Sequence, residues 1–401
     1  MKNLQPWSEH AFEWIRLFSV GIGARGSCTA QMRRASEAAV GELRRLGVQQ
    51  VHTEAFQGAP STYRPFVLAF ASAVVGSLLA LFVAERWALA LGALLSGLGA
   101  WAMLAETDFR DHWARHLLPR APTQNVVGVV PPTAELRQRA VLCAHLDTHR
   151  TPVFYSSPGW LNAFSILVGG TFASMGLGAL LLLLGAATDG LWLRWAVLPL
   201  AALQTFALAL MVSADFTPYT PGANDNTSGV AVALALAERL QTEPLAHTEV
   251  QVLLTDCEET GASGSIAYLD AHAAELNPQQ ALYIAIDQVG AGIVKYLTAD
   301  GLILKHATHP RALELARRAH QALPQVKTLE MAGPAYTDAL PATKRGVAAL
   351  TLCCVDEVDP AAGLNWHQMS DTLEHVQREA LEDMLCFTWQ ILLEMDKEAV
   401  G

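Results

Sequence analysis

Four long stretches without a charged residue most constrain the fold of this 401-residue chain. They occupy residues 65–84, 87–105, 160–187 and 195–214. Each approaches or exceeds the about 20 residues that a helix needs to cross a bilayer. Tryptophans stand near their ends, as an interfacial belt requires, at Trp87, Trp101, Trp160, Trp192 and Trp195. We therefore expect four transmembrane helices in two hairpins, rather than four buried helices of a large soluble core.

Each transmembrane hairpin would return the chain to the side of the membrane from which it left. The predicted hairpins cover residues 65–105 and 160–214. The polar segments around them, residues 1–64, 106–159 and 215–401, would then share one compartment and fold as one discontinuous domain.

Basic residues at the ends of the hairpins predict their orientation. On the side of the polar segments stand Arg64, Arg110, Arg115, Arg120 and Arg150. The opposite turns offer Arg86 and Arg194. The positive-inside rule places the more basic side, and with it the polar domain, in the cytoplasm. The stretches carry no ionisable residue of the kind that a transport pathway usually needs, which argues against a transporter.

The charge balance excludes a general nucleic-acid binder. The chain has 27 Lys and Arg against 38 Asp and Glu, a formal net charge of −11, whereas binding to phosphates needs a basic face. Only 16% of the residues are charged, compared with about 25% in an ordinary soluble domain. The six cysteines lack a zinc-finger spacing, so we expect free thiols.

The polar segments alternate between strand-like and helix-like patterns. Strands are expected near residues 48–56, 124–130, 140–144, 249–257, 281–286 and 346–355. Helices are expected at residues 30–46, 229–240 and 379–395. This alternation predicts an α/β domain with a largely parallel sheet covered by helices on both faces.

Acidic residues and histidines follow four of these strands, where ligands gather in parallel sheets. The residues are His145 and Asp147, Glu258 and Glu259, Asp287, and His367, while Asp225 precedes the helix at 229–240. Each has an ordinary structural interpretation: Asp225 could cap that helix, and Glu258-Glu259 could form a solvated turn. Together, two imidazoles and three carboxylates with a spare glutamate suit a divalent metal, above all zinc. Positions two apart in a strand face the same way, so Asp147 would orient His145 as a ligand.

The arrangement resembles the co-catalytic zinc exopeptidase family, which includes bacterial leucyl aminopeptidases, glutamate carboxypeptidase and the glutaminyl cyclases. The resemblance rests on AHLD (144–147), PGANDNTSG (221–229), CEETGASGS (257–265), AIDQVG (285–290) and WHQMSDT (366–372), in that order. It implies a three-layer α/β/α zinc-peptidase fold with a largely parallel mixed sheet. The four apolar stretches are insertions in that fold.

The resemblance also implies a role for each residue. Asp225 would bridge two zinc ions; His145 and Asp287 would bind one ion, and Glu259 and His367 the other; Glu258 would be the general base, and Asp147 would orient His145. The implied activity is a membrane-embedded exopeptidase that removes N-terminal residues from peptides.

Two other functions remain open at this stage. One is a glutaminyl-cyclase-like acyl transfer, which in that branch uses one zinc ion. The other is a non-catalytic membrane scaffold that uses the peptidase fold for partner binding.

YTDALPA (336–342) resembles the family's substrate-pocket segment without its usual His, and Tyr336 is a candidate for oxyanion stabilisation. The sequence leaves the oligomeric state open.

Two further patterns resemble known motifs without the required context. GIGARG (21–26) fits G-x-G-x-x-G, but a dinucleotide site needs a preceding buried strand and an acidic residue about 20 residues later. HLDTH (145–149) has two histidines four apart. Its strand context and its lack of a Glu at the second position argue against a helical H-E-x-x-H zinc site.

Overall fold

The computed structural model describes residues 5–333, 336–358 and 365–399. The chain forms two compact units. One, called the polar unit below, consists of Met1–Pro60, Arg120–His149 and Tyr219–Gly401. The other, called the apolar unit, consists of Ser61–Pro119 and Arg150–Pro218.

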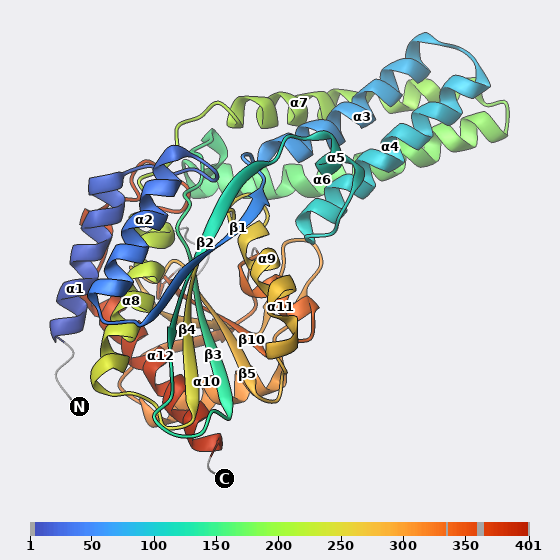
Figure 1. Cartoon of the computed structure of the whole chain (residues 1–401). Coiled ribbons are helices and arrows are strands. Elements are labelled where there is room, and N and C mark those ends of the chain that lie inside the picture. Colours follow the sequence, from blue (N-terminus) through green and yellow to red (C-terminus); the bar gives the residue numbers. More distant parts are fainter. Residues whose placement is uncertain (1–4, 334–335, 359–364, 400–401) are drawn as a thin grey trace. The chain divides into compact units, whose positions relative to one another are not determined.

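The polar unit is built on an eight-stranded mixed sheet in the order β1-β2-β4-β3-β5-β10-β6-β9 (Figure 1). The strands are β1 (Gln50–Gly58), β2 (Ala121–Val130), β3 (Gln138–His145), β4 (Thr248–Thr255), β5 (Ala281–Ile286), β6 (Ile293–Leu297), β9 (Thr328–Met331) and β10 (Ala349–Val355). A small second sheet pairs β7 (Ala299–Asp300) with β8 (His306–Ala307). The central strands β4, β3, β5 and β10 are parallel, so their carboxyl ends meet at one edge.

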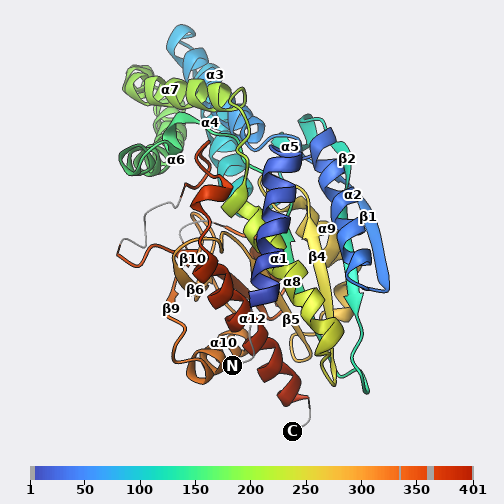
Figure 2. The same ribbon diagram turned by 90° about the vertical axis from the view of Figure 1, so that its left-hand side faces the viewer.

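Helices cover both faces of this sheet, which confirms the predicted three-layer α/β/α architecture. One face packs on α1 (Gln5–Ile15), α2 (Ala30–Arg45), α8 (Gly229–Thr242), α10 (Pro310–Ala322) and α12 (Arg378–Glu398). The other packs on α9 (Ser263–Ala271) and α11 (Ala339–Lys344). Figure 2 shows α1, α8 and α12 side by side.

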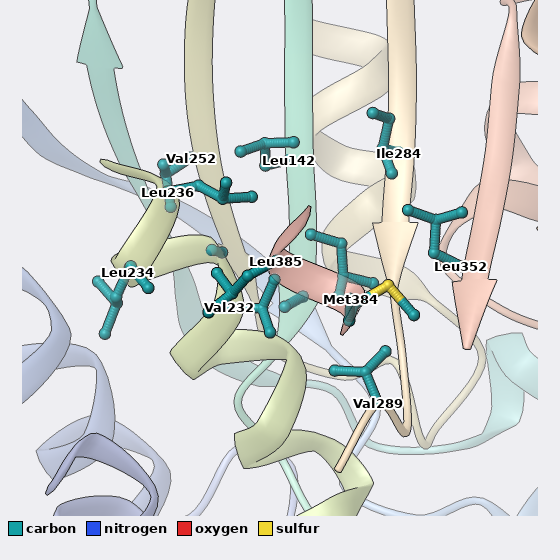
Figure 3. Packing of buried hydrophobic residues seen from close by; sticks show 14 of the residues in the cluster. Leu142, Val232, Leu234, Leu236, Val252, Ile284, Val289, Leu352, Met384 and Leu385 are labelled. Carbon is teal, nitrogen blue, oxygen red and sulfur yellow. The ribbon is translucent and has the colours of Figure 1, made fainter. Parts of the chain in front are cut away.

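Alternate residues of each central strand supply the two cores, because successive side chains of a strand point to opposite faces. Leu142 of β3 packs in the larger core, while its neighbours Val141 and Cys143 belong to the smaller core under α9 and α11. Figure 3 shows Leu142 in the larger core with Met384 and Leu385 of α12. The fully buried strands explain why the sequence shows continuous apolar runs there.

The polar unit is closed by hydrogen bonds at both places where the apolar unit interrupts it. Gly58, the last residue of β1, pairs with Ala121, the first residue of β2, so the first insertion replaces the turn of a β-hairpin. At the second insertion, the amide of Thr220 donates to the carbonyl of His149 at 2.9 Å. The sheet and its strand ends therefore form one continuous framework despite both insertions.

The apolar unit consists of four long helices and a short one. They are α3 (Tyr63–Phe82), α4 (Arg86–Thr107), α5 (Trp113–Leu117), α6 (Pro158–Ala187) and α7 (Leu198–Ala214), the last preceded by a 3-10 turn (Leu191–Val197). The four long helices are long and apolar enough to cross a membrane by length and composition.

Glycines bring α3 and α4 into backbone contact, and the two helices run side by side (Figure 1). A Cβ added to Gly92 of α4 would lie 2.6 Å from the carbonyl oxygen of Gly76 in α3. A Cβ on Gly99 would lie 2.5 Å from the carbonyl oxygen of Ala69. Small residues at helix contacts are typical of packing in membranes, where backbones must approach closely.

Candidate metal centre

The carboxyl edge of the parallel strands carries the predicted site residues. His145 is the last residue of β3, Glu258 and Glu259 follow β4, and Asp287 directly follows β5. Asp225 lies in the kinked segment Ala223–Ser228 before α8. His367 lies in the segment between β10 and α12. The sequence-based placement at strand ends is therefore what the structure shows.

The five predicted ligands converge around Asp225. Nε2 of His145 lies 3.4 Å from Oδ1 of Asp225 and 3.4 Å from Oδ1 of Asp287. Nε2 of His367 lies 3.2 Å from Oδ2 of Asp225 and 3.3 Å from Oε2 of Glu259. Asp225 thus turns one carboxylate oxygen toward each histidine, and the centre has two halves that share this residue.

These distances fit a pair of bound cations. Two atoms that bind one zinc ion tetrahedrally at about 2.0–2.1 Å lie about 3.3–3.4 Å apart. Buried polar atoms normally have hydrogen-bond partners, yet Oδ2 of Asp225 and Oδ1 of Asp287 accept no hydrogen bond from any described residue. Imidazole and carboxylate donors at these separations, two of them with a buried oxygen that lacks a hydrogen-bond partner, are what a metal centre requires, so the residues fit the group.

Proton binding in the site is strongly perturbed. Burial lowers the pKa of His367, but the carboxylates of Glu259 and Asp225 outweigh burial and raise it to about 9. Burial raises the pKa of Glu259 to about 7. For His145, burial is again outweighed by neighbouring carboxylates, and its pKa is raised well above the usual value. A cation that binds these groups displaces their protons.

Asp147 holds the turn after β4 as well as His145. Its carboxylate accepts hydrogen bonds from the amides of Glu258 and Glu259, both at 3.2 Å, and from the hydroxyl of Ser27 at 2.6 Å. Nδ1 of His145 lies 3.0 Å from the carbonyl oxygen of Asp147 and 3.6 Å from its carboxylate. A carbonyl oxygen can only accept, so Nδ1 donates and Nε2 is left as the ligand atom.

The sequence argument assigned this orientation to the carboxylate of Asp147, whereas the nearer acceptor is its backbone carbonyl. The reason is that β3 ends at His145. The two-residue alternation on which the prediction rested therefore stops before Asp147.

Glu258 lies beside the half of the centre that contains His145. One of its carboxylate oxygens is 3.9 Å from Nε2 of His145, and the side chain is buried. Burial raises the pKa of Glu258 well above its usual value, and Glu259 and nearby carboxylates add to this. A buried carboxyl with a high pKa is suited to accept and return a proton.

The sequence argument missed Arg25, which joins two of the ligand-bearing loops. Its fully buried guanidinium donates to the carbonyls of Leu146 at 2.6 Å and Gly222 at 3.1 Å, and to the hydroxyl of Thr227 at 2.5 Å. The first acceptor lies between His145 and Asp147, and the others flank Asp225. Burial lowers the pKa of Arg25 to about 10. Arg25 lies in GIGARG, which begins within a π-helical segment rather than after a strand. The motif therefore does not form a dinucleotide fold, and its arginine instead holds the ligand-bearing loops together.

Two other candidate segments are placed differently. Asp338 of YTDALPA is buried and accepts a hydrogen bond from Thr255 at 2.7 Å, and burial raises its pKa to about 6. Tyr336 is half-buried, and its role at an oxyanion stays a prediction. HLDTH is not helical, but its second histidine, His149, lies against His367 with ring centroids 3.6 Å apart. No pattern in the sequence indicates this contact.

Residues 202–391 match the sequence model of Peptidase family M28. The match covers 190 residues, a little under half of the 401-residue chain. The match contains Asp225, Glu258, Glu259, Asp287 and His367, whereas His145 precedes the second insertion and lies outside it. The resemblance to co-catalytic zinc exopeptidases is confirmed.

Curated relatives of this chain carry aminopeptidase names. A probable lipoprotein aminopeptidase, LpqL, from Mycobacterium tuberculosis is 27% identical over 202 residues, which is 42% of this chain and 38% of the relative. Aminopeptidase YwaD from Bacillus subtilis is 27% identical over 177 residues, covering 42% of this chain and 36% of the relative. The match thus spans less than two fifths of each relative's length.

Solved structures show the same fold. The zinc aminopeptidase BSAP from Bacillus subtilis superposes with a TM-score of 0.58 at 15% identity, covering 96% of this chain and 95% of that one. Glutaminyl cyclase from Tannerella forsythia gives a TM-score of 0.55 at 16% identity, covering 96% and 97%. At these identities the likeness establishes the fold of the chain and not its reaction.

Proposed function

We propose that this chain is a membrane-embedded, zinc-dependent aminopeptidase that hydrolyses N-terminal residues of peptides. The observation that carries the proposal is the shared carboxylate of Asp225, which faces His145 on one side and His367 on the other at 3.4 and 3.2 Å. Zinc prefers the imidazole and carboxylate donors present here.

In this proposal each half of the centre would bind one ion. His145 and Asp287 would bind one zinc ion, Glu259 and His367 the other, and Asp225 would bridge both. Bound there, the pair of cations would lower the pKa of a water molecule and polarise the scissile carbonyl.

The residues of the chain supply the proton transfer. Glu258 accepts the proton of the attacking water and returns it to the leaving amine, the role of a general acid and base in one group. Asp147 fixes the amides of Glu258 and Glu259, so the base and its neighbouring ligand keep their positions relative to His145. Arg25 holds the loops of His145 and Asp225 together.

The negative charge of the site favours binding of a substrate's protonated N-terminus. The positive charge of Arg25 interacts electrostatically with the carboxylates of Asp147, Asp225 and Asp371. Its guanidinium donates to six protein oxygen atoms, those of Phe18, Gly23, Leu146, Pro221, Gly222 and Thr227, which leaves no donor for a substrate carboxylate. An acidic surrounding attracts a protonated N-terminus. The names of the curated relatives point in the same direction.

The apolar unit supports membrane embedding. The most apolar windows of α6 and α7 are only 28% buried within the structure, so large apolar side chains face outward and need an apolar environment. Arg86 and Asp189 at the turns of the two hairpins pair at 3.0 Å. The larger number of arginines at the other ends supports a cytoplasmic position for the polar unit.

A glutaminyl-cyclase-like acyl transfer is the second candidate, because structures of glutaminyl cyclases share the fold. The zinc content separates the two: two ions per chain support hydrolysis, and one ion supports the cyclase reaction. A non-catalytic scaffold is disfavoured because all five ligand-type residues and Glu258 are present and converge.

The test is zinc analysis and turnover of N-terminal and N-blocked peptides by the full chain in detergent or nanodiscs. We expect two zinc ions and hydrolysis only of peptides with a free N-terminus. A protein with bound zinc that cyclises N-terminal glutamine and hydrolyses no peptide contradicts the aminopeptidase proposal.

A further inference from the structure

The segment that carries His367 has a backbone that needs support from outside. Asn365 and His367 have φ angles of 61° and 54°, in the left-handed region that residues with side chains seldom adopt. Such conformations persist only where the surroundings hold them. The contacts of this segment therefore matter for the direction in which His367 points.

His149 covers one face of the His367 ring. The two imidazoles are stacked with centroids 3.6 Å apart and planes 13° from parallel. Trp366 contacts the same ring at 4.5 Å with its plane tilted by 40°. His149 is buried, with 4% of its surface exposed, so its ring is itself held in place.

The backbone of His149 is fixed at the root of the second insertion. Its carbonyl accepts the amide of Thr220 at 2.9 Å. The hydroxyl of Thr220 in turn donates to the carbonyl of Gln368, directly after His367, at 2.9 Å. His149, the last residue of the polar unit before the insertion, and Thr220, the second residue after it, thus both contact the His367 segment.

His149 could support the centre in two ways: a ring nitrogen could bind a metal ion, or the face of the ring could stack on His367. One ligand atom from each of His149, Glu259 and His367 lies within 4.8 Å of the other two, which would allow His149 to bind metal. However, imidazoles that bind one ion point their nitrogens at it, and their ring planes then diverge. Rings at 3.6 Å and 13° lie face to face instead, which favours stacking.

We propose that His149 is a positioning residue for His367. By stacking on the imidazole it fixes the ring so that Nε2 faces Asp225 and Glu259. The inference rests on the proposed function, because it assumes that the Glu259–His367 half of the centre binds an ion. It also links this half to the root of the second insertion, whereas the half formed by His145 and Asp287 does not depend on the stack.

The proposal predicts an asymmetric effect on the two ions. Removing a residue that orients a metal ligand typically weakens metal binding about 10- to 100-fold. H149A should weaken the binding of one zinc ion by that factor and leave the affinity for the other unchanged. H149F keeps an aromatic face without a nitrogen, and it should retain both affinities within a factor of about three, because a phenyl ring can stack on the imidazole in the same way. H149L fills the space without a ring and should resemble H149A.

The experiment is competition of zinc against a chromophoric chelator, with the full chain in nanodiscs and far-UV circular dichroism as the check on folding. H52A is the matched control, since it removes a half-exposed imidazole on β1. Restoration of peptide turnover in H149A by excess zinc is a second expected result.

The outcomes separate the inference from the proposed function. If H149F loses the ion as H149A does, the nitrogen is needed, and the positioning role is overturned in favour of a direct ligand. If H149A and H149L bind zinc as the wild type does, the role is overturned as well. Both results leave the two-zinc aminopeptidase intact, whereas a wild type that binds no zinc overturns both proposals. Should H149A not fold, H149L against H149F decides.

Discussion

The polar and apolar units of this chain expose opposite kinds of side chain. In the polar unit both faces of the central strands are covered by helices, and the strand residues there are almost fully buried. In the apolar unit, large side chains such as Ile166 and Phe206 are 76% and 55% exposed. The first unit is stabilised by removing apolar surface from water, while the second exposes apolar surface of the kind that marks contact with a membrane or another protein.

The two units also differ in their buried polar groups. In the polar unit they include ionisable groups, such as Asp225, Glu259 and His367, that meet at the carboxyl edge of the sheet. In the long helices of the apolar unit, buried polar side chains such as Ser77, Ser96 and Gln204 are uncharged, and the buried Glu106 near the end of α4 is paired with Arg115 at 2.8 Å. Metal chemistry therefore belongs to the polar unit, and the apolar unit has the composition of an anchor.

The largest effect should come from the shared carboxylate. We expect D225N to lose both zinc ions, because a neutral amide removes the charge that faces both histidines, and peptide turnover should fall to background. Zinc per chain by mass spectrometry measures the first result. D270N, at an exposed position paired with Arg345, is the control. Two ions in D225N would show that Asp225 does not bridge.

Glu258 should matter for turnover and not for metal. We expect E258Q to retain zinc and to lose about 10²- to 10⁴-fold in kcat, the usual contribution of a general base. The comparison is with E314Q, which changes a half-exposed glutamate on α10. If E258Q releases zinc, Glu258 is a ligand; if its turnover is unchanged, another group acts as the base.

A charge on the outer surface of the apolar unit should prevent membrane insertion. L177R, in the middle of α6, is expected to oppose insertion by about 2.5–3.5 kcal/mol, visible as protein lost from the membrane fraction. L136R is the matched change in the polar unit, where a side chain of similar exposure faces water and the expected effect is below about 0.5 kcal/mol. Equal behaviour of the two variants would contradict membrane embedding.

The smallest expected effect tests the helix contact within the apolar unit. G92A places a Cβ against the backbone of Gly76 and should destabilise the unit by about 1–3 kcal/mol. At Gly97 of the same helix a Cβ meets nothing within 4 Å, so G97A should be neutral or stabilising by up to about 1 kcal/mol. Thermal unfolding of both variants in detergent gives the comparison, and a stable G92A would show that α3 and α4 can separate.

The sequence predicted those elements whose patterns depend on burial alone. The strand expected at residues 281–286 is β5 with the same bounds, and the helix expected at residues 229–240 is α8 with two more residues. These segments are buried on most sides and therefore continuously apolar. The short strands β6 and β9, which lie at one edge of the sheet, were not predicted, since they carry no comparable apolar run.

The ligands could be predicted from residue type and position at strand ends, but the residues that hold those ligands in place could not. Arg25, Ser27 and His149 act through contacts between segments far apart in the sequence, and neither spacing nor periodicity indicates such contacts. Arg25 even lay in a motif that suggested other chemistry. The atom by which Asp147 orients His145 also differed from the prediction, because the strand ends at His145, two residues before Asp147.

The central claim is that two cations share Asp225 between its neighbours His145 and His367. The most direct measurement is anomalous diffraction at the zinc absorption edge from crystals of the full chain. The account predicts two peaks about 3.5–4 Å apart, one on each side of the Asp225 carboxylate. A single peak, or density at a place away from these side chains, would contradict it.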